Sequence, residues 1–338
     1  MTGLKKPHVH PVDEAWLALG AEPRTNRTIE IVDSHIHLWD FSDPPYFADS
    51  YARDAAAAGI SSCIYVDCTM GYRGSGPVEL RPAGEVEFAR AQAEAVPAGI
   101  NVGAAIIGWA DLTLGDAVGE VLAELRRVGD GRFRGVRCRA TYDPDPQAGY
   151  GAGGPGPGLL LREDFQRGVR RLHEDGHVLD LYAFHTQLRE VAALAQCFPD
   201  LPIVLNHIGG PLGIGRYANL REQVYADWAA GMSEVAQCPN VVVKIGGFAI
   251  SRVAIVDAAG RALPPSSAEV AELCRPWVRH CIDAFGADRC MFGSNFPVDK
   301  VAMPLTTLVN AMMVLTADLS LADQQAFFGR TAMETYGL

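Results

Sequence analysis

The amino-acid sequence predicts an α/β protein built as a (β/α)8 (TIM) barrel, because eight short apolar runs alternate along it with amphipathic, helix-like segments. Strands of a parallel sheet are buried on both faces and read as such runs, and eight of them suit a closed barrel better than an open sheet. An open dinucleotide-binding sheet would carry Gly-x-Gly-x-x-Gly after its first strand, and that motif does not follow here. We expect the barrel over residues 29–338, preceded by an irregular N-terminal arm at 1–28.

The arm is polar and contains three prolines. After it, expected strands and helices alternate regularly along the chain. Strands are expected where β-branched residues cluster, as in Ile29, Ile31 and Val32. The expected strands are 29–34, 62–67, 101–107, 134–139, 178–183, 203–206, 241–245 and 290–293. The expected helices are 85–96, 114–128, 163–174, 188–197, 220–236 and 268–285, with a last helix at 320–338 that closes the barrel. The Gly- and Pro-rich segment 143–158 reads equally well as a lid or as a disordered insertion.

Composition limits the classes of function. The chain has 338 residues, of which 49% are hydrophobic, and this is ample for a large core. A net charge of -11 argues against a nucleic-acid binder. No apolar run reaches the roughly 18 residues that span a membrane, and the N-terminus lacks the apolar core of a secretion signal. The eight scattered cysteines form no Cys-x-x-Cys and read as reduced thiols of a cytoplasmic protein. A homo-oligomer is compatible with the sequence, although no feature indicates one.

Polar residues gather where the expected strands end. His35 and His37 are two positions apart in an extended segment, so their rings point to the same side and can converge on one point. His-x-His at the end of a buried strand is typical of a metal site, because imidazole is a common ligand of zinc-like ions. By the same reasoning, His185 follows the fifth strand, His207 the sixth and Asn295 the eighth. Barrel enzymes carry their chemistry at these ends, so we expect an active site here.

These motifs resemble those of the amidohydrolase superfamily, and in particular its amidohydrolase-2 branch of small-lactone hydrolases and aromatic-acid decarboxylases. The resemblance covers most of residues 29–338. It rests on Asp-Ser-His-Ile-His at 33–37, Asn-His-Ile-Gly-Gly-Pro at 206–211 and Phe-Gly-Ser-Asn-Phe-Pro at 292–297. It points to lactonases similar to pyrone-dicarboxylate lactonase and to sugar-lactone hydrolases.

The resemblance implies roles for individual residues. In the family, two first-strand histidines, a fifth-strand histidine and an eighth-strand aspartate hold a divalent ion. By position, His35, His37 and His185 are the implied ligands of zinc, or alternatively manganese. The sixth-strand histidine of the family assists the substrate carbonyl or a proton transfer, so His207 is the implied acid–base or electrostatic group.

The sequence departs from the family at Asn295, where an aspartate is usual. An amide cannot accept a proton, and it is a weaker metal ligand than a carboxylate. Three consequences stay open. The histidines and water hold the metal, or His207 or Asp299 replaces the aspartate as the base, or the site holds no metal and nearby arginines and histidines polarise the carbonyl. Some lactonases of this branch are thought to need no metal.

Positive side chains suggest how the substrate is bound. Arg137 and Arg139 lie on the fourth expected strand, Arg73 and Arg81 lie in the loop after the second, and Lys244 closes the seventh. Arginine binds a carboxylate through two parallel hydrogen bonds, so these residues are candidates for recognising a carboxylated small molecule. The alternative, which stays open, is that they pair with acidic residues of the protein itself.

The residues and the resemblance together predict a hydrolase that opens a small lactone with metal-activated water, and the lactone is carboxylated if the arginines bind substrate. A first alternative is a metal-dependent decarboxylase of an aromatic or unsaturated acid. A second is a metal-free lactonase, or a catalytically idle barrel that binds a ligand, and Asn295 keeps this alternative open.

Overall fold

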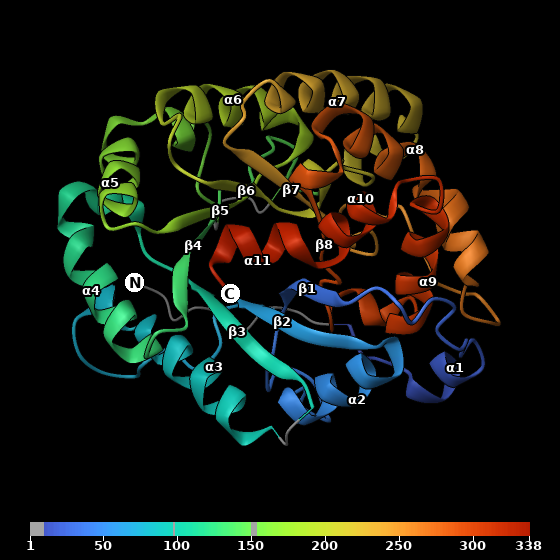
Figure 1. Ribbon diagram of the computed structural model, residues 1–338. Coiled ribbons are helices and arrows are strands. Elements are labelled where there is room, and N and C mark those ends of the chain that lie inside the picture. Colours follow the sequence, from blue (N-terminus) through green and yellow to red (C-terminus); the bar gives the residue numbers. More distant parts are fainter. Residues whose placement is uncertain (1–9, 97–98, 150–153) are drawn as a thin grey trace.

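Eight parallel strands form one sheet, with each strand hydrogen-bonded to the next along the chain (Figure 1). The computed structural model describes residues 10–96, 99–149 and 154–338. The strands are β1 (Ile31–Ile36), β2 (Ile60–Val66), β3 (Asn101–Gly108), β4 (Phe133–Arg139), β5 (Val178–Tyr182), β6 (Ile203–Leu205), β7 (Val241–Ile245) and β8 (Cys290–Phe292). The expected (β/α)8 fold is thereby confirmed.

The sheet closes where the segment after β8 meets β1. The backbone N–H of Asn295 donates to the His35 carbonyl at 2.8 Å, and the His37 N–H donates to the Phe296 carbonyl at 2.8 Å. This junction places residues 35, 37 and 295 on neighbouring backbone segments at the C-terminal end of the barrel.

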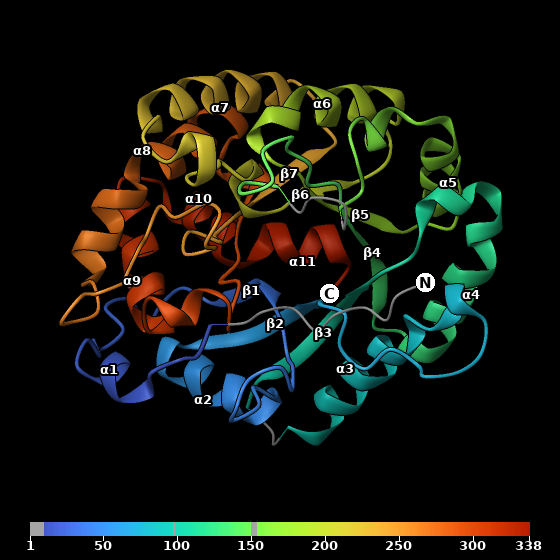
Figure 2. The same cartoon turned by 180° about the vertical axis from the view of Figure 1, so that it is seen from behind.

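Helices surround the sheet on the outside (Figures 1 and 2), as expected for βα units whose helices bury one apolar face. They are α2 (Ala48–Ala58), α3 (Ala83–Ala95), α4 (Val118–Gly129), α5 (Glu163–Glu174), α6 (Leu188–Cys197), α7 (Arg221–Ala236), α8 (Ser267–Phe285), α9 (Leu305–Leu315), α10 (Leu321–Gln325) and α11 (Thr331–Tyr336). A π-helical turn at Ala326–Arg330 connects α10 to α11, where one continuous helix was expected. In the part of the chain described, no helix is long and apolar enough to cross a membrane.

The N-terminal end of the barrel is sealed by α11, which lies across it in Figure 1. Ala332 and Tyr336 pack against the interior layer of apolar strand residues, which includes Val32, Ile64 and Val204. The seal leaves the C-terminal end as the place for chemistry.

The described part of the expected arm, residues 10–28, contains a short helix, α1 (Glu14–Ala18). Arg24 anchors this segment by donating to the carbonyls of Gly59 at 2.7 Å and Ile29 at 2.5 Å. Thr25 adds a backbone hydrogen bond to the Asn310 side chain on α9.

Candidate active site

His35, in β1, and His37, directly after it, lie side by side at the end of the strand. His35 and His37 are almost fully buried, and their ring centroids are 5.0 Å apart in an edge-to-face arrangement. Asp33 supports the turn: its carboxylate accepts from the backbone N–H of His35 at 3.2 Å and of Ser294 at 2.8 Å, and from the Tyr51 hydroxyl at 2.9 Å. The carboxylate therefore joins β1 to the segment after β8.

Hydrogen bonds fix the tautomers of both rings. Nδ1 of His37 lies 2.8 Å from the Val66 carbonyl, which can only accept, so this nitrogen carries the proton and Nε2 keeps a lone pair. A guanidinium N–H of Arg137 donates to Nε2 of His35 at 3.3 Å, so the proton of neutral His35 is on Nδ1. Nδ1 of His35 is buried and has no hydrogen-bond partner among the described residues. A buried donor of this kind is suited to a water or substrate atom.

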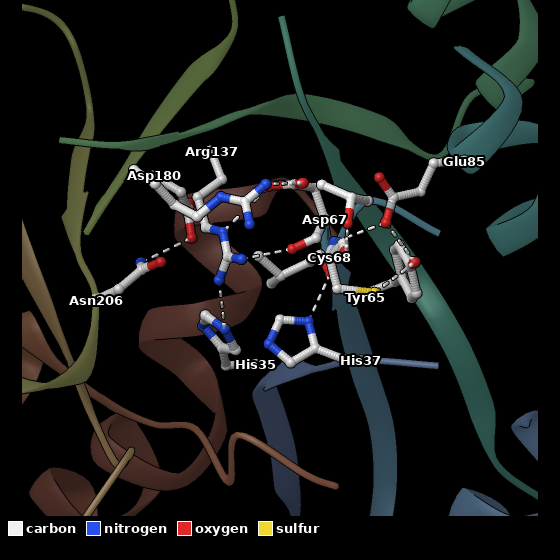
Figure 3. Close-up of polar contacts among 12 residues, drawn as sticks. His35, His37, Tyr65, Asp67, Cys68, Glu85, Arg137, Asp180 and Asn206 are labelled. Carbon is white, nitrogen blue, oxygen red and sulfur yellow. Dashed lines mark hydrogen bonds and ion pairs between the residues drawn. The ribbon is translucent and has the colours of Figure 1, made fainter. Parts of the chain in front are cut away.

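One carboxylate, that of Asp67, accepts hydrogen bonds from both arginines of β4, and Figure 3 shows it beside Arg137. Arg137 donates to the Asp67 side chain at 3.2 Å and to its carbonyl at 2.6 Å, while Arg139 donates to the other carboxylate oxygen at 3.0 Å. Arg137 is almost fully buried, whereas the Arg139 side chain is 36% exposed. Arg137 is thus held against His35, and Arg139 is the more accessible of the two.

Sequence reasoning did not single out Asp67. The signal was available, because this residue ends the second expected strand, and the strand-end rule selected the histidines by that criterion.

His207 completes the cluster from β6. Its ring centroid lies 4.4 Å from that of His35 and 4.9 Å from the ring of Tyr182, which meets it edge-on. The backbone turns sharply here: φ is +53° at His207 and +49° at Ile208, a left-handed conformation that is uncommon for residues other than glycine. Gly247 packs so closely against the imidazole that a Cβ there would lie 2.5 Å from Nδ1.

The three clustered histidines are held in the neutral form. Burial lowers the pKa of His35, His37 and His207 well below the usual value, and the positive charge of Arg137 lowers all three further. A neutral imidazole keeps a lone pair that can take a proton, and the lowered pKa means that the protonated ring gives this proton up again readily, so a histidine here can accept a proton and return it within one turnover.

Below the histidines lies a buried polar group inside the barrel. The Asp180 carboxylate accepts from Lys244 Nζ at 2.7 Å, from the Asn206 amide at 3.0 Å and from the Tyr336 hydroxyl at 2.7 Å. Lys244, expected at the substrate, is 1% exposed and is paired with this aspartate.

Asn295 faces Asp299. Its backbone has φ of +60°, and its side-chain amide donates to Asp299 Oδ1 at 2.9 Å. The other Asp299 oxygen accepts from the Ala249 N–H at 3.2 Å. Burial raises the pKa of Asp299 to about 7 despite these hydrogen bonds.

Three other expected site residues are not brought to the cluster. His185 accepts a hydrogen bond from the Leu212 N–H at 3.3 Å and packs against Tyr217. It lines a separate cavity of about 530 Å³ that also contains residues of α6 and α7. Arg81 donates to the Gly76 carbonyl at 3.4 Å.

Arg73, the third, forms ion pairs on the outer surface. It pairs with Glu87 on α3 and with Glu124 on α4, at 2.7 Å from the latter. None of its described contacts is with the histidine cluster.

Residues 143–149 lie over this end of the barrel. The Asp143 carboxylate accepts from Arg216 at 3.0 Å and from Tyr217 at 2.7 Å, and Ala148 is buried with Tyr182 in a small apolar cluster. Tyr182 also contacts His207, so one residue separates this segment from the histidine cluster. Residues 150–153 of the expected lid lie outside the described residues.

The donor atoms do not form the metal set that the family implies. Among the residues that the structure describes, no group of three or more His, Cys, Asp and Glu side chains is placed to hold a metal ion. Nε2 of His35 is engaged by the Arg137 guanidinium, itself a cation, and residue 295 supplies an amide instead of a carboxylate. The residues therefore do not fit the ion, and we assign no catalytic step to it.

Comparisons with known proteins identify the family of the chain. The sequence matches a family model described as Amidohydrolase over residues 32–338. An L-fucono-1,5-lactonase from Burkholderia multivorans is 30% identical over 237 residues, which are 70% of this chain and 72% of that protein.

Two solved structures have the same fold. An amidohydrolase from Burkholderia multivorans with bound zinc is 25% identical, with a TM-score of 0.68 over 91% of this chain and 99% of that one. A 5-carboxyvanillate decarboxylase from Novosphingobium aromaticivorans with manganese has a TM-score of 0.59 over 95% of this chain and 99% of that one, but only 12% identity. The latter likeness shows the fold alone.

Proposed function

Because the chain belongs to the amidohydrolase family, and so is a hydrolase, we propose that it opens a small lactone that carries a carboxylate. The observation that carries the proposal is the Asp67 cluster, in which Arg137 lies against a neutral histidine while Arg139 remains accessible. The 30% sequence identity between the chain and an L-fucono-1,5-lactonase supports a cyclic ester as the substrate. Arg139 binds the substrate carboxylate, and Arg137 faces the ester carbonyl.

Ring opening follows from these positions. A water attacks the ester carbon and gives its proton to His207, a neutral base. The carbonyl oxygen becomes an oxyanion, which the Arg137 guanidinium stabilises. The ring C–O bond then breaks, and His207 returns the proton to the leaving oxygen, so that the product is a hydroxy acid. The Nε2 lone pair of His37 accepts a hydrogen bond from the attacking water.

The test is an assay of proton release on a panel of lactones with and without a carboxylate. We expect turnover of carboxylated members. Arg137→Gln should lower kcat by roughly 100- to 1000-fold, the usual cost of losing one oxyanion donor. Arg139→Ala should raise KM for carboxylated lactones only. Arg132→Ala, at the opposite end of the barrel, is the matched control. Equal losses on both lactone classes in Arg139→Ala would argue against carboxylate recognition.

The role of a metal is tested separately. With the present donor set, we expect protein purified without added metal to keep its lactone-opening rate after chelation. Asn295→Asp restores the carboxylate of the family motif, so its zinc content should be compared with that of the wild type. A zinc-dependent rate in the wild type would overturn this proposal and return His35 and His37 to the role of ligands.

Assays on the same panel of compounds also test the two alternative functions, decarboxylation and ligand binding without catalysis. Decarboxylation is supported by a likeness of fold alone, and release of carbon dioxide from aromatic acids would reveal it. An idle binding barrel would show no turnover of any compound, together with thermal stabilisation by one of them.

A further inference from the structure

A buried carboxylate outside the cluster holds the segment on which the cluster is built. Glu85, near the start of α3, is 1% exposed. Its Oε1 accepts from the Cys68 N–H at 2.6 Å, the Met70 N–H at 3.1 Å and the Tyr65 hydroxyl at 2.8 Å (Figure 3). Three donors on one oxygen fix both the end of β2 and the turn that follows it.

The turn needs such support because its backbone is strained. Thr69 has φ of +70°, a left-handed conformation that is costly for a β-branched residue. The N–H groups on either side of it, from Cys68 and Met70, are the two that Glu85 accepts. Without that acceptor, both N–H groups would be buried and unsatisfied, and the turn could relax toward an ordinary conformation.

The same segment orients three site side chains. The Val66 carbonyl fixes the tautomer of His37, and Asp67 holds both Arg137 and Arg139. Val66 and Asp67 lie between Tyr65 and Cys68, both of which Glu85 binds, so a shift of the turn would move all three contacts.

We propose that Glu85 is the positioning residue of this site, because it fixes the turn after β2 from which Asp67 and Val66 orient the arginines and His37. The inference rests on the proposed function for its kinetic consequences only. Its structural consequence, the orientation of His37, can be measured without any substrate.

The chemistry of Glu85 indicates a conservative replacement. Burial, and next the negative charge of Asp67, raise its pKa to about 7, so a large fraction carries a proton at neutral pH. Its second oxygen has no hydrogen-bond partner in the described part of the chain. Glutamine has the shape of the protonated acid and keeps an acceptor oxygen for the turn. Alanine removes the acceptor, and aspartate is one methylene shorter.

The test compares Glu85→Gln, Glu85→Ala and Glu85→Asp with Val86→Ala, a matched control that loses packing from the same helix but keeps the Glu85 contacts. The first readout is the 15N NMR signal of His37, identified by its loss in His37→Gln. We expect Glu85→Gln to keep the wild-type tautomer and the alanine variant to lose it. If the alanine variant does not fold, the aspartate variant takes its place.

The second readout is lactone opening. Glu85→Ala should lower kcat/KM by roughly 10- to 100-fold, the effect of displacing catalytic groups by about 1 Å, while Glu85→Gln stays close to the wild type. An unchanged His37 signal with unchanged kinetics in folded Glu85→Ala would overturn the inference, as would an equal kinetic loss in Val86→Ala. If the wild type opens no lactone but the His37 signal responds as expected, the proposed function fails and the positioning role stands.

Discussion

At the scale of single residues, the neighbouring carboxyl of Asp299 explains why position 295 holds an asparagine in place of the usual aspartate. Its side-chain amide donates to the carboxyl group of Asp299. Burial raises the pKa of this carboxyl group to about 7. An aspartate at 295 would place two carboxylates within hydrogen-bond distance in a buried site, and one of them would have to hold a proton. The amide avoids this conflict, and it also removes the usual proton acceptor of the family motif. The exchange of one residue therefore changes both the charge and the chemistry of the site.

The Asn295→Asp variant should be destabilised more strongly at high pH than at low pH. The pair would bind a proton in the folded state that separate aspartates release when unfolded, so stability is lost as pH rises toward the folded pKa. Urea unfolding at pH 6 and pH 8 measures the difference. Asn101→Asp adds a charge at an exposed position and should show no such pH dependence. An equal loss of stability at both pH values in Asn295→Asp would mean that the two carboxyl groups do not interact.

At the scale of elements, local pattern was sufficient for the barrel but not for every site residue. The strands were predicted correctly because they are short, apolar and rich in β-branched residues. The helices α5 and α6 have the expected bounds. The helices α2 and α9 were not anticipated. The run Ala48–Ala58 is too rich in alanine to show a clear apolar stripe. In Leu305–Leu315 every residue except Val314 is buried, the polar ones included, so neither run shows the separate apolar and polar faces of a surface helix.

The position of His185 shows why the strand-end rule has limits. The rule applies to residues at the point where a strand stops. β5 ends at Tyr182, three residues before His185, and the side chain of His185 meets Tyr217. His37 also lies past its strand, but pairing with Phe296 keeps it extended. Such tertiary contacts cannot be read from a single sequence.

The helix α11 stabilises the barrel through Tyr336. Its hydroxyl donates to buried Asp180 at 2.7 Å, so Tyr336→Phe should lower the free energy of unfolding by about 1–3 kcal/mol, the usual cost of a lost hydrogen bond to a buried charged group. Denaturant titration measures the change. Tyr225→Phe, which removes a long 3.5 Å hydrogen bond near the surface, is the control and should have little effect. Equal stability of Tyr336→Phe and the wild type would show that Asp180 is satisfied by Lys244 and Asn206 alone.

At the scale of the whole molecule, two sets of buried groups have opposite effects on the free energy of unfolding as pH changes. The first set is five histidines with lowered pKa, two of them near 4: His35, His37, His177, His185 and His207. The second set is three acids whose pKa values are raised by burial, to about 6 for Asp33 and about 7 for Glu85 and Asp299. Burial is the largest cause in every case, so the pH dependence of stability reports on the core.

The free energy of unfolding should pass through a maximum near pH 7. Below that pH the unfolded histidines take up protons that the folded ones refuse, so stability falls as pH decreases, by at most about 1.4 kcal/mol per pH unit for each proton. The acids act in the opposite direction: folding keeps protons on them that the unfolded chain releases, so their contribution is full at low pH and is lost as pH rises toward 7. Unfolded histidines are half protonated at about pH 6.5 and still partly protonated at pH 7, so five of them outweigh the three acids up to about pH 7. Urea unfolding from pH 5 to pH 8 measures the curve. His177→Gln, which removes a ring that contacts Arg126 away from the site, should make the rise up to pH 7 shallower. A maximum near pH 5 would mean instead that the buried acids outweigh the histidines.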